Sequence, residues 1–244
     1  MNSTSNIGEK LVPIKVSAIK ETKTFKLADS FWSIIWLIVL VLLGFRIFVY
    51  QQVSVQGASM QPNYQDRDML LINQVDRNFK RGQVVAVYED KEIAKNANYF
   101  TRFDPKTVFF LKRVIALPGE EIEMVGSKVI VYNSEFPKGA VINEEYVATN
   151  IKDSEDLTKF YFPKTKIQSD MYFLLGDNRT NSTDSRKKGA FPVYSLFGQE
   201  NIKYWPLGKA STFTLPSYTY SNLTSENLQK IEEYKENYLL QPKF

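Results

Sequence analysis

The stretch TVFFLKRVIALPG, residues 107–119, decides the fold class of this chain. Residues 108–117 are rich in branched and aromatic residues, and a Pro-Gly pair closes the run, as is typical of a β-strand that ends in a turn. Because side chains alternate between the two faces of a strand, Lys112 shares its face with Phe110 and Val114. The stretch therefore predicts a strand that carries a lysine among apolar side chains.

Short runs of the same composition recur from residue 51 onward, separated by Gly, Asn, Asp and Pro. We expect strands at residues 53–55, 69–72, 84–88, 108–117, 122–125, 129–132 and 171–175. The Gly-Ser-Lys sequence at residues 126–128 predicts a hairpin turn between two of them. The sequence therefore predicts a mostly β domain over residues 51–224, with a smaller inserted β lobe at about residues 120–170.

The N-terminal part has a different composition. Residues 1–29 are polar with scattered lysines, which predicts a flexible cytoplasmic tail. Residues 30–50 carry a single charge, Arg46, and as a helix they would be roughly 31 Å long, enough to cross a bilayer. A buried core helix and a cleavable signal peptide are the alternatives. The length and composition of this stretch predict a single-pass helix in the cell membrane. The lysines before it place the N-terminus in the cytoplasm, so that everything after Tyr50 lies outside.

Residues 225–240 predict a C-terminal amphipathic helix. The apolar residues that recur at helical spacing after Ser225 are Leu228, Ile231, Tyr234 and Tyr238. Such an apolar stripe is more often a docking face than a functional site.

The chain contains no histidine and no cysteine, which narrows its chemistry. Without histidine, a Ser-His-Asp triad and a His-ligated zinc site are excluded; without cysteine, so are thiol catalysis and disulfides. An enzyme built from this chain needs a Ser, Thr, Lys, Tyr or carboxylate nucleophile, with Lys or a carboxylate as its base. The net charge of +4 is too small and too dispersed to indicate nucleic-acid binding.

Lys112 has two interpretations. If its strand is buried, desolvation lowers the lysine pKa from about 10.4 toward the value of about 7 to 8 that suits a general base. If its strand lies at a sheet edge, the lysine faces solvent and its stem only covers apolar surface. Arg113 points to the opposite face, where we expect it to make a structural ion pair.

Two further stretches carry polar residues in turns. The stretch VSVQGASMQP, residues 53–62, indicates a strand that breaks at a glycine and presents Ser59. The stretch LLGDNRTNSTDSR, residues 174–186, indicates a buried strand that runs into a dense polar turn. Its two acidic and two basic residues could satisfy one another, and the hydroxyls of Ser182 and Ser185 could orient an amine. A purely structural turn and a carboxylate cation site, such as a calcium loop, are the alternatives.

Together these stretches resemble the type I signal peptidases, membrane-anchored Ser-Lys endopeptidases that remove signal peptides from exported proteins, and in particular their Gram-positive form. The matching motifs are Gly-x-Ser-Met-x-Pro at residues 57–62, RGQVV at 81–85, KRVI through PG at 112–119, and GDNR through S-x-DSR at 176–186. Each motif alone is common, but their order behind an apolar N-terminal stretch is specific. The resemblance implies a signal-peptidase-like β catalytic domain preceded by one N-terminal transmembrane helix.

The resemblance also implies roles for the matching residues. Ser59 would be the nucleophile and donate its backbone N–H to the oxyanion, Lys112 would be the general base, and Ser182 would hydrogen-bond the lysine amine. Asp184 and Arg186 would form a supporting ion pair. The residues implied to shape the turn are Gly176, Asp177 and Arg179. The residues implied to line shallow pockets for small side chains, one and three residues before the cut, are Val53, Val55, Met60, Phe110 and Leu111. No cofactor or metal is implied.

The chain departs from the family pattern at a few positions. Asn63 and Tyr64 follow Pro62 where the family usually has Thr-Leu, so we expect Tyr64 to reshape a pocket wall. Gly57 supplies no side-chain hydroxyl for the oxyanion, which leaves the second oxyanion donor unassigned.

The implied partners are preproteins with signal peptides, the lipid bilayer and the protein export machinery, without nucleic acid. Two alternative functions share related folds: an assembly factor for surface polymers such as pili, acting with or without cleavage, and a self-cleaving regulator. Assembly factors of this kind usually lose the Ser or the Lys, whereas both are present here. The apolar N-terminal stretch and the absence of a recognisable DNA-binding helix pair argue against the regulator.

Overall fold

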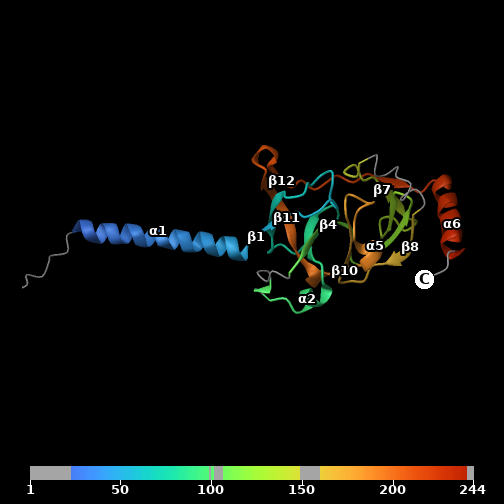
Figure 1. Ribbon diagram of the computed structural model, residues 1–244. Helices are drawn as coiled ribbons and strands as arrows, with labels where there is room; N and C mark the ends of the chain where they lie inside the picture. Colours follow the sequence, from blue (N-terminus) through green and yellow to red (C-terminus); the bar gives the residue numbers. More distant parts are fainter. Residues whose placement is uncertain (1–22, 99, 102–106, 149–159, 241–244) are drawn as a thin grey trace, which may run out of the picture. The chain divides into compact units, whose positions relative to one another are not determined.

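The computed structural model describes residues 23–98, 100–101, 107–148 and 160–240 (Figure 1). The chain divides into two compact units, Met1–Gly44 and Phe45–Phe244. Within the described residues, helix α1 (Lys23–Phe48) supplies the first unit, and every strand belongs to the second. The second unit therefore confirms the prediction of a mostly β domain.

Helix α1 differs from the prediction at both ends. It includes residues 23–29, assigned to the flexible tail by composition, because that stretch contains no glycine or proline to stop a helix. It ends before Tyr50, which already pairs with Asn73 between the first two strands. Within the described residues, no helix is both long enough and apolar enough to span a membrane. The transmembrane helix predicted for residues 30–50 is therefore not confirmed, and residues 1–22 lie outside the described residues.

The larger sheet of the second unit has eight strands and is antiparallel throughout. Its order is β1 (Tyr50–Ser54), β2 (Met69–Asn73), β11 (Leu196–Trp205), β3 (Val84–Tyr88), β4 (Phe109–Ala116), β9 (Met171–Leu175) and β10 (Phe191–Pro192), with β12 (Ser211–Thr212) paired to β11. Strand β4 is the one predicted from residues 108–117, and it lies between β3 and β9. Lys112 therefore belongs to an interior strand and not to an edge strand.

The smaller sheet has five antiparallel strands. Its order is β13 (Tyr220–Asn222), β7 (Ala140–Ile142), β6 (Lys128–Tyr132), β5 (Glu121–Val125) and β8 (Tyr161–Lys166). The predicted hairpin turn joins β5 to β6 at Gly126, whose φ of +60° suits a two-residue turn. Four of these strands lie within residues 120–170, but β13 joins them from the C-terminal part, and both sheets belong to one compact unit. The sheet is thus not built from a single inserted segment.

Strand β11 is the longest described strand, yet its sequence does not predict a strand. The segment LFGQENIKYW mixes a glycine with polar residues, so it shows neither an apolar run nor clean alternation. Gln199 and Glu200 are nonetheless buried, because Gln199 donates to Asp76 at 2.8 Å and Tyr64 donates to Glu200. Tertiary partners therefore decide that this segment becomes a central strand.

Short helices connect the strands. They are α2 (Lys91–Lys95), α5 (Ser185–Lys188) and the 3₁₀ turns η2 (Val193–Ser195) and η3 (Leu207–Lys209). Asp90 caps α2 and Asp184 caps α5, since their side-chain oxygens accept backbone N–H groups at the helix starts. Helix α2 lies in the segment between β3 and β4.

The C-terminal helix α6 runs over Ser225–Leu240. Ile231 is buried against side chains of the smaller sheet, and Tyr234 packs beside it. Leu228 is exposed instead, so the predicted apolar stripe is only partly buried. The Tyr238 side chain lies outside the described residues.

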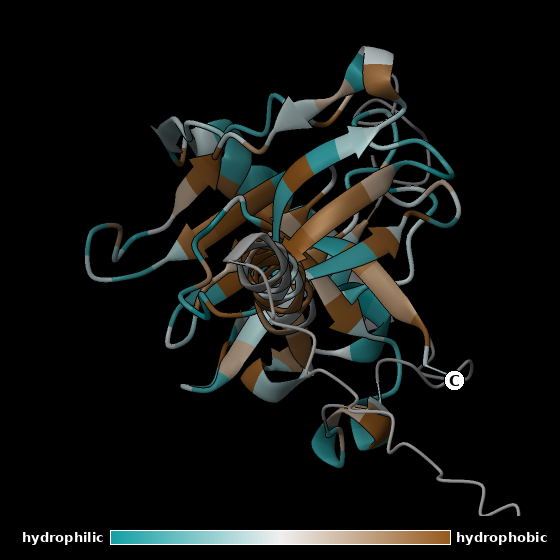
Figure 2. Cartoon of the chain, turned by 90° about the vertical axis from the view of Figure 1, so that its left-hand side faces the viewer, coloured by the Kyte–Doolittle hydropathy of each residue, from teal (hydrophilic) through white to brown (hydrophobic). Residues whose placement is uncertain are grey.

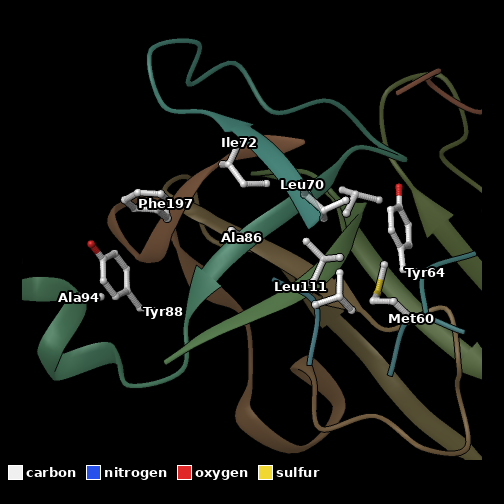
Figure 3. Close-up of a cluster of buried hydrophobic side chains, with 11 residues drawn as sticks. Met60, Tyr64, Leu70, Ile72, Ala86, Tyr88, Ala94, Leu111 and Phe197 are labelled. Carbon is white, nitrogen blue, oxygen red and sulfur yellow. The ribbon is translucent and has the colours of Figure 1, made fainter. Parts of the chain in front are cut away.

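Figure 2 shows hydrophobic residues along many strands of the second unit. The buried apolar side chains of these strands form clusters inside the unit. One buried cluster, drawn in Figure 3, contains Val55 and Met60 from either side of Ser59, and Leu111 from the position before Lys112. Because one cluster packs against both segments, it holds the Ser59 turn and β4 at a fixed separation. The core thus positions the two residues on which the candidate chemistry depends.

Candidate active site

Ser59 lies half-buried in the turn that follows β1. The chain leaves the extended conformation at Gly57, whose φ of +80° favours glycine. The Gly57 N–H donates to Asp66 Oδ1 at 2.9 Å, which anchors the start of the turn. The turn then brings the Ser59 hydroxyl to Lys112 on β4.

Lys112 makes two hydrogen bonds with its amine. The Nζ atom lies 2.9 Å from Ser59 Oγ and 2.9 Å from the Leu111 carbonyl oxygen. The residue is only 2% exposed. Burial lowers the pKa of the amine from 10.5 to about 8, although the charges of Asp184 and Asp177 oppose part of this change. Of the two interpretations of Lys112, the structure supports the buried one.

Arg113 points to the opposite face of β4 and forms the ion pair expected for it. Its guanidinium donates to both carboxylate oxygens of Asp177, at 2.8 and 2.6 Å, and to the Gly82 carbonyl at 2.7 Å. Asp177 also accepts a hydrogen bond from the Asn63 amide at 2.8 Å. Asp177 therefore ties the polar turn to β4 and to the segment that follows Ser59.

The four charged residues of the polar turn do not satisfy one another as a group. Asp184 and Arg186 do form an ion pair, in which Arg186 Nε and Nη2 donate to the two carboxylate oxygens at 2.9 and 2.8 Å. Arg179 instead donates to both oxygens of Glu144, at 2.7 and 2.5 Å. Burial raises the pKa of Asp184, but the hydrogen bond and charge of Arg186 outweigh it, so the pKa is lowered. The sequence offers no sign of Glu144, because it lies 35 residues from its partner and outside every motif.

The two hydroxyls of the polar turn have other surroundings than those predicted. Ser182 Oγ is buried and, within the described residues, makes no hydrogen bond to the Lys112 amine, so the predicted bond is not formed. Its hydroxyl acts on Asp184 instead and helps to lower the pKa of that carboxyl. The amine is instead directed to its two other acceptors. Ser185 Oγ accepts the Leu174 N–H at 2.9 Å, which places it at the end of β9 and not at the amine.

Gly176 allows the polar turn to approach the Ser59 turn closely. A Cβ atom at this position would lie 2.3 Å from Ser182 Oγ and 2.5 Å from the Ser59 carbonyl oxygen. Any side chain would therefore push the two turns apart. The backbone of Gly176 is not in the left-handed region, so its conformation does not require a glycine. A glycine is needed here because there is no space for a Cβ atom.

The residues predicted to line substrate pockets lie in different surroundings. Val55, Met60 and Leu111 are buried in the cluster of Figure 3, with Val53 at its edge, and Phe110 packs against another cluster. An open cleft of about 360 Å³ lies between β1 and the start of β4. Its lining residues are Gln51, Gln52, Val53, Ser54, Gln56, Thr107, Val108 and Phe109. Only Val53 of the predicted five lines this cleft, because the other four pack into the core.

Tyr64 does not line the cleft either. Its hydroxyl donates to Glu200, and both groups are buried. Burial raises the pKa of both, that of Glu200 to about 7. With Arg113 these residues line a separate cavity of about 240 Å³, so Tyr64 forms part of a pocket wall, but not of the cleft beside β1.

The arrangement suits proton transfer between a serine and a lysine. A neutral amine at hydrogen-bond distance can take the proton of a hydroxyl, and with a pKa of about 8 roughly a tenth of the Lys112 amine is neutral at pH 7. In the described part of the chain, no group of three or more acidic, histidine or cysteine side chains could hold a metal ion.

Comparison with known proteins gives one consistent family. The model of the family described as "Signal peptidase, peptidase S26" matches residues 28–205. Signal peptidase I P of Bacillus subtilis subsp. natto is 32% identical over 198 residues, which cover 78% of this chain and 95% of that protein. Signal peptidase I of Bacillus amyloliquefaciens is 30% identical over 198 residues, which cover 78% of this chain and 94% of that protein.

A crystal structure of a signal peptidase I from Enterococcus faecalis aligns with 49% of this chain and 94% of that chain, at 23% identity and a TM-score of 0.34. This structural likeness is too weak to carry weight, but the sequence match spans most of the chain. The reported relatives have peptidase names and lend no support to an assembly factor. The chain therefore belongs to the signal peptidases of the peptidase S26 family.

Proposed function

We propose that this protein is a serine endopeptidase that removes N-terminal signal peptides from exported preproteins, with Ser59 as nucleophile and Lys112 as general base. One observation carries the proposal: Lys112 Nζ lies 2.9 Å from Ser59 Oγ in a desolvated site that lowers the lysine pKa to about 8. A serine without a histidine partner needs another base to become nucleophilic. Lys112 meets this need because its amine lies within hydrogen-bond distance of Ser59 Oγ and is partly neutral near pH 7.

The reaction proceeds through an acyl-enzyme. Ser59 Oγ attacks the scissile carbonyl while its proton passes to the neutral Lys112 amine, and the Ser59 backbone N–H donates to the oxyanion. The Lys112 ammonium then gives this proton to the leaving amine of the mature protein. Lys112, neutral again, takes a proton from water as the water attacks the ester. The Lys112 ammonium then gives this proton to the departing Ser59 Oγ, which releases the signal peptide and restores both the Ser59 hydroxyl and the neutral amine.

We propose that the substrate lies extended along the cleft between β1 and the start of β4, with small residues one and three positions before the cut. The packing of Val55, Met60 and Leu111 into the core supports this preference. Side chains that pack into the core form a filled floor near Ser59, which favours small substrate side chains.

The cellular location and the partners beyond preproteins stay predictions from the sequence. Side chains of α1 such as Phe31, Trp36 and Leu40 are largely exposed, and apolar surface of this extent is normally covered. Alkaline extraction of cell membranes followed by immunodetection tests the location. Recovery of the full chain in the soluble fraction would contradict it.

The function is tested by cleavage of a preprotein with an Ala-x-Ala site. We expect Ser59→Ala and Lys112→Met to lower kcat by roughly 1,000-fold or more, since each removes a reacting group. The matched controls are Ser221→Ala and Lys187→Met, which alter an exposed serine and an exposed lysine. Undiminished cleavage by either active-site variant would contradict the Ser-Lys mechanism, and no cleavage by the wild-type chain would contradict the function.

A further inference from the structure

Asn178 bonds two consecutive carbonyl groups of the Ser59 turn. Its backbone N–H donates to the Ser59 carbonyl oxygen at 3.0 Å, and its side-chain Nδ2 donates to the Ala58 carbonyl oxygen at 3.1 Å. Asn178 lies 120 residues beyond Ala58 in the chain, so these contacts exist only in the folded protein. The Ala58 carbonyl also accepts the Gln61 backbone N–H at 3.2 Å within its own turn, so Asn178 supplies a second donor from a distant part of the chain. Asn178 thus adds to the bonds that hold the backbone on which the nucleophile sits.

The Asn178 side chain is itself held in one orientation. Its Oδ1 atom accepts the Thr180 hydroxyl at 3.0 Å and the Asn181 backbone N–H at 3.3 Å. Because the carbonyl end of the amide is occupied in this way, its NH₂ end is directed at Ala58. The contact to Ala58 is therefore part of a built arrangement of hydrogen bonds.

The Ala58 carbonyl and the Ser59 N–H belong to the same peptide group. A trans peptide group is planar, and its C=O and N–H point in opposite directions, so fixing the carbonyl fixes the direction of the N–H. Within the described residues, the Ser59 N–H makes no hydrogen bond. Donation to a carbonyl also polarises the peptide group, which strengthens its N–H as a donor.

We infer that Asn178 is a positioning residue, which aims the Ser59 backbone N–H at the oxyanion by holding the Ala58 carbonyl. The inference rests on the proposed function, because it assumes that Ser59 forms a tetrahedral intermediate. Asn178 acts through the Ala58–Ser59 peptide group and not through a contact with the substrate. Its effect is therefore on the transition state and not on substrate binding.

The test uses the full chain with Asn178→Ala and Asn178→Asp. Both variants keep the backbone N–H bond to Ser59, and Asn178→Asp also keeps the side-chain size while it replaces the donor to Ala58 by an acceptor. We expect kcat to fall roughly 10- to 100-fold, somewhat less than the 10²- to 10³-fold loss typical when an oxyanion donor is deleted. For Asn178→Ala, which changes no charge, KM and the pH midpoint of activity should stay unchanged, since Lys112 keeps its contacts. The matched control is Asn181→Ala, which removes an exposed amide from the same turn.

Inhibitor binding separates positioning from general damage. A peptide aldehyde forms a tetrahedral adduct with Ser59 and uses the oxyanion donor, whereas the cleaved signal-peptide product does not. We expect aldehyde affinity to fall by the same factor as kcat/KM and product affinity to stay unchanged. Equal losses for both ligands together with a lowered melting temperature would assign Asn178 a structural role only.

Two outcomes distinguish this inference from the proposed function. Full activity of Asn178→Ala beside inactive Ser59→Ala would overturn the role of Asn178 alone. Full activity of Ser59→Ala would overturn the proposed function and this role with it.

Discussion

Lys112 and Arg113 are consecutive cations on β4 with opposite electrostatic surroundings. Lys112 lies on the face that carries Ser59, and none of the described carboxylates is in hydrogen-bond contact with it, so burial lowers its pKa to about 8. Burial also disfavours the charged form of Arg113, but its bidentate pair with Asp177 outweighs this effect and raises the pKa. The alternation of a strand thus separates a reactive amine from a structural ion pair one residue away.

Activity should rise with pH through the Lys112 pKa. Because only the neutral amine can accept the Ser59 proton, we expect kcat/KM to increase about tenfold per pH unit below pH 8 and to level off above it. Lys112→Arg should be inactive across this range, since a guanidinium stays protonated. The measurement is the pH profile of peptide cleavage. A profile that is flat from pH 6 to pH 9 at roughly constant ionic strength would point to another base.

Lys112→Met should stabilise the fold while it abolishes activity. The folded-state pKa of about 8 lies below the ordinary value of 10.5, so the unfolded chain binds more protons between these values and stability rises with pH there. Below pH 8 the folded protein bears the full cost of burying the charged amine. Because Lys112→Met removes this cost, we expect the free energy of unfolding of the variant at pH 7 to be higher by roughly 3 kcal/mol. Urea titrations at pH 7 and near pH 10.5 provide the comparison. A gain that does not shrink at the higher pH would contradict this account.

Breaking the buried Arg113–Asp177 ion pair should lower the free energy of unfolding much more than removing an exposed ion pair does. Both side chains are almost fully buried, so Asp177→Ala leaves an uncompensated guanidinium and should lower the free energy of unfolding by about 3–5 kcal/mol. The matched control is Lys164→Ala, which removes a pair with Glu121 that is 46% and 37% exposed and should cost at most about 1 kcal/mol. Denaturant unfolding measures both. Similar losses for the two variants would show that the buried pair does not tie the polar turn to β4.

Gly176→Ala should displace Ser59 although it adds a single methyl group. The new Cβ would lie 2.5 Å from the Ser59 carbonyl oxygen and 2.3 Å from Ser182 Oγ, closer than atoms can approach without movement. We expect a large loss of kcat, on the order of 100-fold, because small displacements of reacting groups are costly. Gly208→Ala is the control, since nothing lies within 4 Å of its added Cβ. Cleavage assays with both variants decide the matter, and equal activities would mean that the two turns can separate without harm.

Local composition predicts several of the strands, and its failures have a common cause. β3 and β9 are rich in branched and aromatic residues, and their bounds match the prediction. β11 and β13 contain polar residues and become strands because their backbones pair with neighbouring strands. In β11 the buried Glu200 is also satisfied by Tyr64, from the turn that follows Ser59. Pairing of this kind cannot be read from a single segment.

By itself the sequence determined the class of chemistry and the family. The absence of histidine and cysteine leaves lysine as a base for serine, and the order of the motifs indicates a signal peptidase. Only the tertiary structure decided that Lys112 is buried beside Ser59, that Arg179 pairs with Glu144, and that Asn178 holds the Ser59 turn. Composition and motif order are properties of the chain, whereas burial and hydrogen bonding depend on residues that folding brings together from 35 to 120 positions apart.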